Sequence, residues 1–190
     1  RRVLFRSLRR KHVLAVFARV PPCLVGMEAC GGAHYWAREI GRLGHTVKLL
    51  PARDVKGYAK RLKTDASDAE AICEAATRLR NRGVPIKSVD QQCLLMLHKT
   101  RASLMEMRTK AANQVRAHLS ELGIVAPRGV DGFDRLCAML KDAACADVPP
   151  LARLALLPRL AVLGEIDRGL AALDARIRGS SKSDPTSRRL

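Results

Sequence analysis

The sequence predicts an α/β domain followed by long helices, and three observations support this fold class. CLVGMEAC at residues 23–30 is a nearly continuous apolar run of strand length, typical of a strand buried on both faces. HTVKLL at 45–50 is the next expected strand, and an amphipathic helical pattern separates the two. This strand–helix–strand order predicts a right-handed crossover between adjacent parallel strands. Between Ser88 and Gly123 neither proline nor glycine interrupts roughly 34 residues, which predicts a helix about 50 Å long that leaves the globular body.

Short elements fill the first 87 residues. VLFRSL at 3–8 predicts a short strand, and RKHVLAVFARV at 10–20 predicts a helix that ends at two prolines. We expect Tyr35 and Trp36, in the helix between the two main strands, to pack in the core rather than to stack on bases. From 51 to 76 the pattern is again helical with an interruption near 62–64, and VPIK at 84–87 reads as a short extended piece. The apolar stripe of the helix between the strands consists of Ala33, Trp36, Ala37, Ile40 and Leu43.

From Ser88 onward the chain is expected to be helical. Ser88 and Gln91 form an S-x-x-Q capping box at the start of the long helix. A loop at 124–132, a short amphipathic helix at 133–144 and a linker at 147–150 follow. A final segment has apolar residues in steps of three and four, which predicts a coiled coil or helical hairpin: Leu163, Ile166, Leu170, Leu173 and Ile177. We therefore expect an α/β domain at 1–88, a helical or coiled-coil region at 89–178 and a disordered tail at 179–190.

Composition points to a polyanionic partner. Lysine and arginine number 35 against 18 aspartates and glutamates, a net charge of +17, and this field attracts nucleic acid. No apolar run is long enough to cross a bilayer, so we expect a cytosolic protein without a membrane partner. The six cysteines form no C-x-x-C pair and are interpreted as buried, reduced thiols. Aromatic residues make up only 3%, so base stacking is not expected to dominate binding.

Three carboxylates are candidates for a metal site. Asp65 and Asp68 in KRLKTDASDAEAI share a helix face, and their like charges favour a cation between them. Glu28 lies at the C-terminal end of the first apolar strand, where open α/β sheets place their sites. Three oxygen ligands of this kind suit Mg²⁺ or Mn²⁺. A simpler interpretation remains open for all three acids. Thr64 or Asp65 would cap the helix, and Asp68 in the first turn would be stabilised by the helix dipole. Glu28 would reach solvent or form a salt bridge with Arg53 or Lys56.

Two groups of cations are candidates for gripping a phosphate backbone. The first precedes the acidic pair and the second lies on or beside the apolar stripe of the long helix. For any single lysine, a solvated helix face is the favoured interpretation. The first group is Arg53, Lys56, Lys60, Arg61 and Lys63, and the second is Lys99, Arg101, Arg108, Lys110 and Arg116.

Three segments resemble the N-terminal half of the DEDD-type insertion-sequence transposases, the insertion-sequence one-ten family. They are CLVGMEACGGAHYWAREIGRLGHTVKLL at 23–50, VKGYAKRLKTDASDAEAICEA at 55–75, and the long-helix segment at 84–129. The resemblance covers roughly residues 3–129 and rests on the Met-Glu-Ala-Cys strand, the Lys-x-Asp-x-x-Asp-Ala-x-x-Ile helix and the Gln-Gln-x-x-x-x-Leu-His helix in this order.

The resemblance implies a partial RNase H-like, RuvC-like domain followed by a coiled coil. It also implies a bacterial, nucleoid-associated DNA recombinase that binds DNA and a structured guide RNA, forms homo-oligomers through its coiled coil, and uses Mg²⁺ or Mn²⁺. Of the family's four catalytic and metal-binding acids, the last three correspond to Glu28, Asp65 and Asp68.

Two departures from the family pattern bear on activity. The strand carrying the first family aspartate would precede Arg1, and the serine-bearing domain would follow Leu190. We therefore expect a fragment that keeps nucleic-acid affinity but is inactive alone. Two other functions remain open, a non-catalytic basic nucleic-acid-binding module and a RuvC-like junction resolvase.

Overall fold

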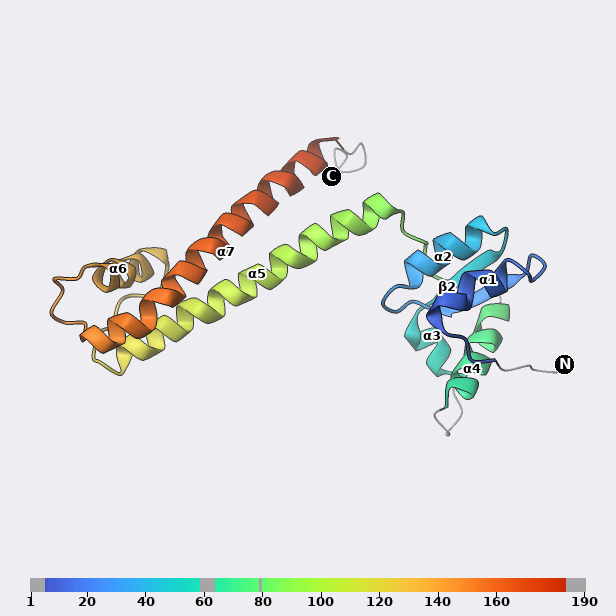
Figure 1. The fold of residues 1–190 in the computed structure, drawn as a ribbon, viewed down its shortest axis with the longest axis horizontal. Helices are drawn as coiled ribbons and strands as arrows, with labels where there is room; N and C mark the ends of the chain where they lie inside the picture. Colours follow the sequence, from blue (N-terminus) through green and yellow to red (C-terminus); the bar gives the residue numbers. More distant parts are fainter. Residues whose placement is uncertain (1–5, 59–63, 79, 184–190) are drawn as a thin grey trace. The chain divides into compact units, whose positions relative to one another are not determined.

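The chain folds into two compact units. The computed structural model describes residues 6–58, 64–78 and 80–183. The first unit, Arg1–Gln92, is called here the α/β unit, and the second, Cys93–Leu190, the helical unit (Figure 1). The boundary between the units falls inside the long helix, α5, which spans Val89–Ser120.

A parallel pair of strands forms the centre of the α/β unit. Strand β1 (Leu24–Glu28) pairs with β2 (Thr46–Leu50), and the register runs from Leu24 opposite Thr46 to Glu28 opposite Leu50. Helix α2 (Ala33–Arg42) connects the two strands, as the sequence predicts. Val84 adds one antiparallel bridge to Leu49 within the segment predicted to be extended.

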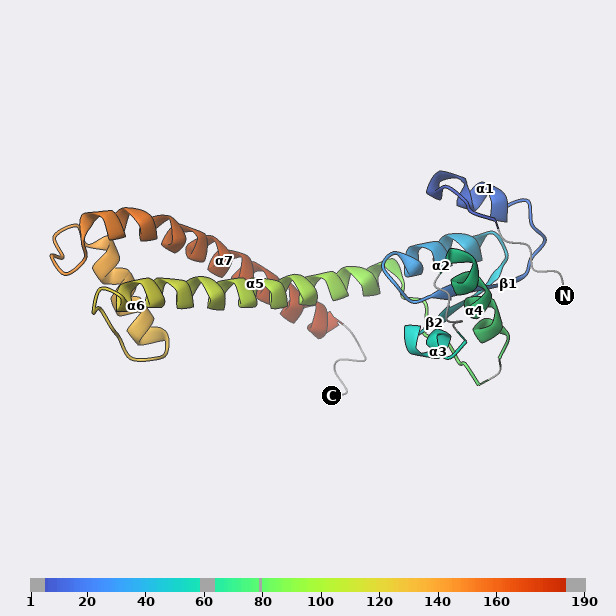
Figure 2. The ribbon, with the colours of Figure 1, turned by 90° about the horizontal axis from the view of Figure 1, so that it is seen from below.

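Helices cover both faces of this sheet (Figure 2). On one face Leu49 is fully buried against Ala33 and Ala37 of α2. On the other face Leu50 packs with Val55 of α3 (Ala52–Lys56) and Ala71 of α4 (Asp65–Thr77). Successive residues of a strand point to opposite faces, so Leu49 and Leu50 serve the two layers. The α/β fold class is confirmed.

Helix α4 lies very close to β1 because residue 26 is glycine. A Cβ added to Gly26 would lie 2.6 Å from the Cβ of Ala76. Lys48, the register partner of Gly26, donates from Nζ to the carbonyl oxygens of Ala76 and Arg78 at 3.0 and 3.1 Å. These bonds satisfy carbonyls that the C-terminal end of a helix leaves without partners. The Gly26–Lys48 pair therefore lies level with the C-terminal end of α4.

The N-terminal end of α4 lies toward the C-terminal edge of the sheet. Helix α3 follows β2 directly at this edge and packs beside α4. Leu50, the last residue of β2, shares one apolar cluster with both helices. Helix α4 therefore runs against the direction of the two strands, and its first turn is near the edge where β1 and β2 end.

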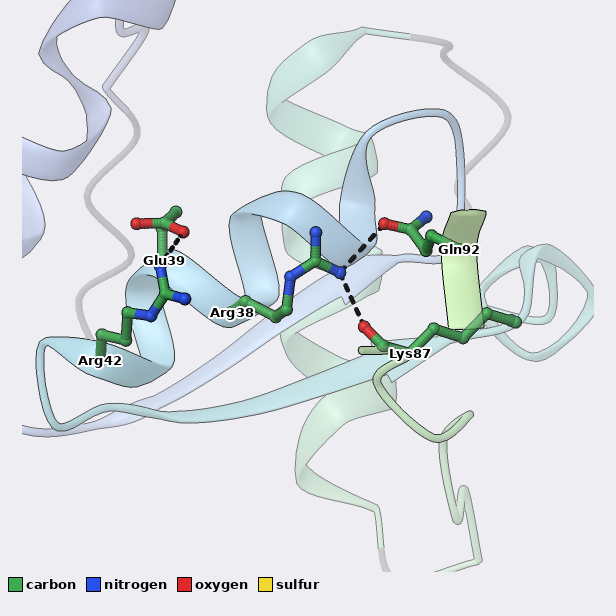
Figure 3. A network of polar contacts seen from close by, with 5 residues as sticks. All are labelled: Arg38, Glu39, Arg42, Lys87 and Gln92. Atoms are coloured by element: carbon green, nitrogen blue, oxygen red, sulfur yellow. Dashed lines mark hydrogen bonds and ion pairs between the residues drawn. The ribbon is translucent and has the colours of Figure 1, made fainter. Parts of the chain in front are cut away.

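Arginine and histidine side chains fix the start of α5 to α2. Arg38 Nη1 donates to the carbonyl of Lys87 at 2.7 Å and to Oε1 of Gln92 at 3.0 Å (Figure 3). The Lys87 backbone N–H donates to Nδ1 of His34 at 3.1 Å. Burial, followed by the charges of Lys87 and Arg38, lowers the pKa of His34, which favours the neutral ring that can accept this bond. Ser88 and Gln91 form the predicted capping box.

The helical unit is an antiparallel hairpin with a short helix at its closed end. Helix α5 lies beside α7 (Pro150–Ser183), and α6 (Val130–Lys141) packs where they meet (Figures 1 and 2). Arg101 pairs with Asp174 and Arg108 with Asp167, so the residue numbers rise on one helix as they fall on the other. The buried core at the closed end consists of Val115, Leu119, Leu136, Leu140, Val148 and Leu156.

Leu163, Ile166 and Leu170 of the predicted heptad seam are buried, at 5–7% exposure. These residues are therefore buried within the chain, where α7 lies beside α5. This is the helical hairpin, one of the two alternatives that the spacing predicted. Helix α7 continues to Ser183, five residues into the predicted tail, and 184–190 lie outside the described residues.

Three other expectations are wrong in part. Tyr35 is 44% exposed rather than in the core, because the buried face of α2 consists of Ala33, Ala37 and Ile40. The cysteines are free, but Cys23, Cys30, Cys73 and Cys93 are exposed.

The predicted strand at 3–8 is also wrong where it can be compared, since 6–8 are not in a strand and 3–5 lie outside the described residues. A strand needs a neighbour for its backbone hydrogen bonds, and no described strand pairs with this segment. Instead, a 3₁₀ turn, η1 (Arg10–His12), leads into α1 (Val13–Phe17).

Candidate metal and nucleic-acid site

Glu28 lies at the C-terminal edge of the sheet on the side covered by α4. It ends β1 and is two residues from Gly26, so both residues belong to the same face of the strand. The side chain is half-buried. The close contact between Gly26 and α4 lies two residues before Glu28 on the same face of β1.

Asp65 and Asp68 occupy the first turn of α4. Thr64 is the N-cap, and its hydroxyl accepts from the backbone N–H of Ser67 at 3.2 Å. Ser67 Oγ accepts in return from the backbone N–H of Thr64 at 3.0 Å, which completes a capping box. The cap is therefore Thr64, one of the two residues that the sequence offered for this role. Both aspartates are exposed, as expected for anions beside a helix N-terminus.

Glu28 at the end of β1 and Asp65 and Asp68 at the start of α4 do not close a metal site in this structure. Within residues 6–58, 64–78 and 80–183, no three His, Cys, Asp or Glu side chains lie close enough to hold an ion together. Within the same ranges, the carboxylates of Glu28, Asp65 and Asp68 make no hydrogen bond or ion pair. The salt bridge considered for Glu28 is thus not formed, and Arg53 instead lies 3.4 Å from Asp54.

The first cationic group has two described members. Arg53 and Lys56 belong to α3, which follows β2 at the same edge of the sheet, and both are exposed. Lys60, Arg61 and Lys63 lie outside the described residues. The described part of this edge therefore carries two exposed cations, both on α3.

Three of the five predicted cations on α5 have partners inside the helical unit. Arg101 and Arg108 pair with Asp174 and Asp167 of α7. The Arg116 guanidinium donates to the carbonyls of the loop before α6, including that of Gly129 at 2.8 Å. Lys99 and Lys110 are exposed. The sequence contained a pattern that could have predicted these ion pairs. The two arginines are seven residues apart on α5, and the two aspartates are seven residues apart on α7.

Sequence reasoning missed two residues that position the site, Gly26 and Lys48. A glycine inside a strand often marks a close approach of another backbone, so Gly26 carried a usable signal. Lys48 had none, since a lysine on a strand is equally consistent with a solvated side chain.

Comparisons with known proteins point to one family. Residues 4–124 match the family model of the IS110-type DEDD transposases. The chain is 45% identical over 172 residues to a probable family 20 transposase of Pseudomonas aeruginosa, covering 90% of this chain and 49% of that protein. It is 37% identical over 190 residues to the transposase for insertion sequence element IS1328 of Yersinia enterocolitica, covering 99% of this chain and 55% of that protein.

The chain spans about half the length of the curated relatives that it matches. No solved structure matches it. Among the helices that the structure describes, none combines the length and the apolar character needed to cross a bilayer. The family match covers more than half of the chain and includes Glu28, Asp65 and Asp68. This protein therefore belongs to the IS110-type family of DEDD transposases.

Proposed function

We propose that this chain supplies the carboxylate-bearing part of an insertion-sequence transposase that acts on DNA. In this proposal Glu28, Asp65 and Asp68 hold Mg²⁺ or Mn²⁺ in a RuvC-like arrangement. The observation that supports it is that Glu28 ends β1 on the face covered by α4, that Asp65 and Asp68 begin α4, and that none of the three carboxylates has a partner among the described residues. Open α/β sheets bind ligands at the carboxyl ends of their strands, and Glu28 lies at such an end.

The donor set fits a small divalent cation. Mg²⁺ prefers oxygen ligands, keeps several waters, and is commonly held by one or two carboxylates together with substrate phosphates. Such a site does not need three protein ligands in contact before substrate binds, so the open arrangement is compatible with it. When bound, the ion would supply charge stabilisation for phosphodiester chemistry. The acids of this chain would position the ion, and the α3 cations Arg53 and Lys56 would orient the phosphate backbone.

The net charge of +17 supports a nucleic-acid partner. On the helical unit, Lys99 and Lys110 are exposed cations that could contact phosphates. Our proposal includes DNA as the substrate, a structured guide RNA as a further partner and assembly into homo-oligomers. The last two rest on the family resemblance alone.

Metal-dependent thermal unfolding tests the proposed site. The melting temperature of the chain is measured with increasing Mn²⁺ or Mg²⁺, and compared with that of Glu28→Gln, Asp65→Asn and Asp68→Asn. A ligand that binds only the native state stabilises it by about 2.7 kcal/mol at one hundred times its dissociation constant. We expect a metal-dependent rise in the original chain and a much smaller rise in each variant.

The matched control is Asp131→Asn. Asp131 is also an exposed acid in the first turn of a helix, α6, so its loss removes a similar interaction with a helix dipole. This variant should keep the full metal response. If the original chain shows no metal response, or Asp68→Asn responds as strongly, the proposed metal site is wrong. DNA binding that persists in that case would favour the non-catalytic binding module.

A further inference from the structure

A pocket that is separate from the acidic edge opens between η1, α1 and α2. It has a volume of about 530 Å³ and is lined by Arg10, Lys11, Leu14, Tyr35 and Trp36. This volume is within the usual range for small-molecule sites, roughly 300–1,000 Å³. Below, these five residues are called the Tyr35–Trp36 pocket.

The two aromatic residues of the pocket lie outside the buried face of α2. That face consists of Ala33, Ala37 and Ile40, with Trp36 half-buried at its margin and Tyr35 exposed. Tyr35 is 44% exposed, and its ring centroid lies 5.1 Å from that of Trp36, with the rings edge to face. A chain with one tryptophan and two tyrosines thus places two of these three residues in one open pocket.

Positive charge surrounds the rings. The Arg10 guanidinium carbon lies 4.9 Å from the centroid of the Trp36 ring, a cation–π contact. Lys11 is exposed beside it, as is Arg9, one residue before η1. None of the described residues that line the pocket is acidic. The pocket therefore offers flat apolar faces together with charges that attract an anion.

We propose that the Tyr35–Trp36 pocket binds an unpaired nucleotide, with its base against the aromatic rings and its phosphate beside Arg10 and Lys11. Aromatic faces next to cations are the usual combination for single-stranded nucleic acid, because every base has a face that can stack. Bases in a duplex are already stacked, so the pocket selects an unpaired or extruded one. The inference rests on the proposed nucleic-acid function and adds a defined site to it.

Trp36 is the single tryptophan of the chain, so its fluorescence reports on this pocket alone. The whole chain is titrated with a DNA pentamer of deoxyuridine, an RNA pentamer of uridine and a blunt-ended, fully paired DNA duplex. We expect both pentamers to quench Trp36 to saturation and the duplex to leave it unchanged. Stronger quenching by RNA would identify the 2′-hydroxyl as part of recognition, and equal quenching would restrict recognition to base and phosphate.

Two variants and one control test whether the quenching of Trp36 comes from binding in the Tyr35–Trp36 pocket. Stacking contributes about 1–3 kcal/mol per base, so Tyr35→Leu should weaken pentamer binding by about 5- to 150-fold. Lys11→Gln should weaken it and reduce its salt dependence. The control Lys141→Gln removes an exposed lysine at the end of α6 that does not line the pocket, and it should leave the quenching curve unchanged. Circular dichroism confirms that each variant is folded.

The two failures can be told apart. If the chain binds DNA but neither pentamer quenches Trp36, or if Tyr35→Leu binds as tightly as the original, the pocket inference is wrong while the proposed function stands. The metal response described above is independent of the pocket, so its loss would count against the proposed function alone.

Discussion

At the scale of single residues, Gly26 bears directly on where the acids lie. It is a point of close contact between β1 and α4, since a Cβ added there would lie 2.6 Å from Ala76 Cβ and 3.3 Å from Ile72 Cγ2. Any side chain here would push α4 away from the sheet. Since Asp65 and Asp68 begin that helix and Glu28 ends that strand, the distance between the acids depends on this contact.

Gly26→Ala is therefore expected to destabilise the chain. Overpacking costs roughly 1–3 kcal/mol, and alanine recovers only about 0.4–1 kcal/mol by restricting the unfolded chain. Chemical denaturation should show a lower midpoint. The same variant should weaken the Mn²⁺ response, because a displaced α4 carries both aspartates with it.

Gly41→Ala is the matched control and should have the opposite sign. Gly41 lies within α2, and a Cβ built there meets nothing within 4 Å. Alanine at such a position stabilises a helix by roughly 0.5–1 kcal/mol. A Gly26→Ala protein as stable as the original would show that the contact with Ala76 relaxes freely, and would contradict the positioning role of Gly26.

Residue-level predictions succeeded where a local pattern determines the outcome. Thr64 and Ser88 cap their helices because side-chain caps depend on neighbours three residues away. The exposure of Tyr35 could not be predicted, since α2 buries only a narrow face, Ala33, Ala37 and Ile40. Whether Arg101 contacts phosphate or a carboxylate also depends on a helix about seventy residues away, which local spacing does not reveal.

At the scale of elements, charged pairs fix the register of α5 against α7. Arg101–Asp174 and Arg108–Asp167 repeat at seven-residue intervals on both helices, so a shift by one turn would break both. The hydrogen bond from Arg101 holds the pKa of Asp174 below its usual value. The hairpin is therefore expected to depend on pH through this carboxyl group.

A lowered native pKa means that folding favours the ionised form. The resulting stability is fully present above the ordinary aspartate pKa, about 3.9, and is lost as pH falls below it. Asp174→Asn should therefore lower the denaturation midpoint at pH 7, and the difference from the original chain should shrink as pH falls below about 4.

Asp134→Asn serves as the control for this pH series. Asp134 is exposed on α6, and no ion pair involves it among the described residues. Its variant should match the original chain across the whole range. If Asp174→Asn differs from the original equally at pH 7 and at pH 3, ionisation of Asp174 is not the cause, and the pair does not stabilise the hairpin as inferred.

The elements themselves were largely predictable. The order of β1, α2 and β2 followed from apolar runs with different periods, and α5 followed from the absence of helix breakers. Helix α6 begins at Val130, three residues earlier than expected, because Gly129 accommodates a positive φ of 108° immediately before it. The choice between a coiled coil and a hairpin could not be made from a heptad pattern, since both bury the same seam.

At the scale of the whole molecule, the two units divide the expected tasks. The α/β unit contains the acidic edge and the Tyr35–Trp36 pocket, and the helical unit contains the hairpin with Lys99 and Lys110. The acids could be selected from sequence because they end or begin predicted elements. How closely they approach one another could not, because that distance depends on the packing of α4 on β1.

The most direct test of the account is iron-mediated cleavage of the backbone. Fe²⁺ replaces Mg²⁺, and ascorbate with peroxide generates hydroxyl radicals that cut the chain nearest the bound ion. If Glu28, Asp65 and Asp68 share an ion, fragments should end near residue 28 and near residues 65–68, and excess Mg²⁺ should suppress both cuts. Cleavage at neither segment, or at only one of them, would contradict a shared metal site.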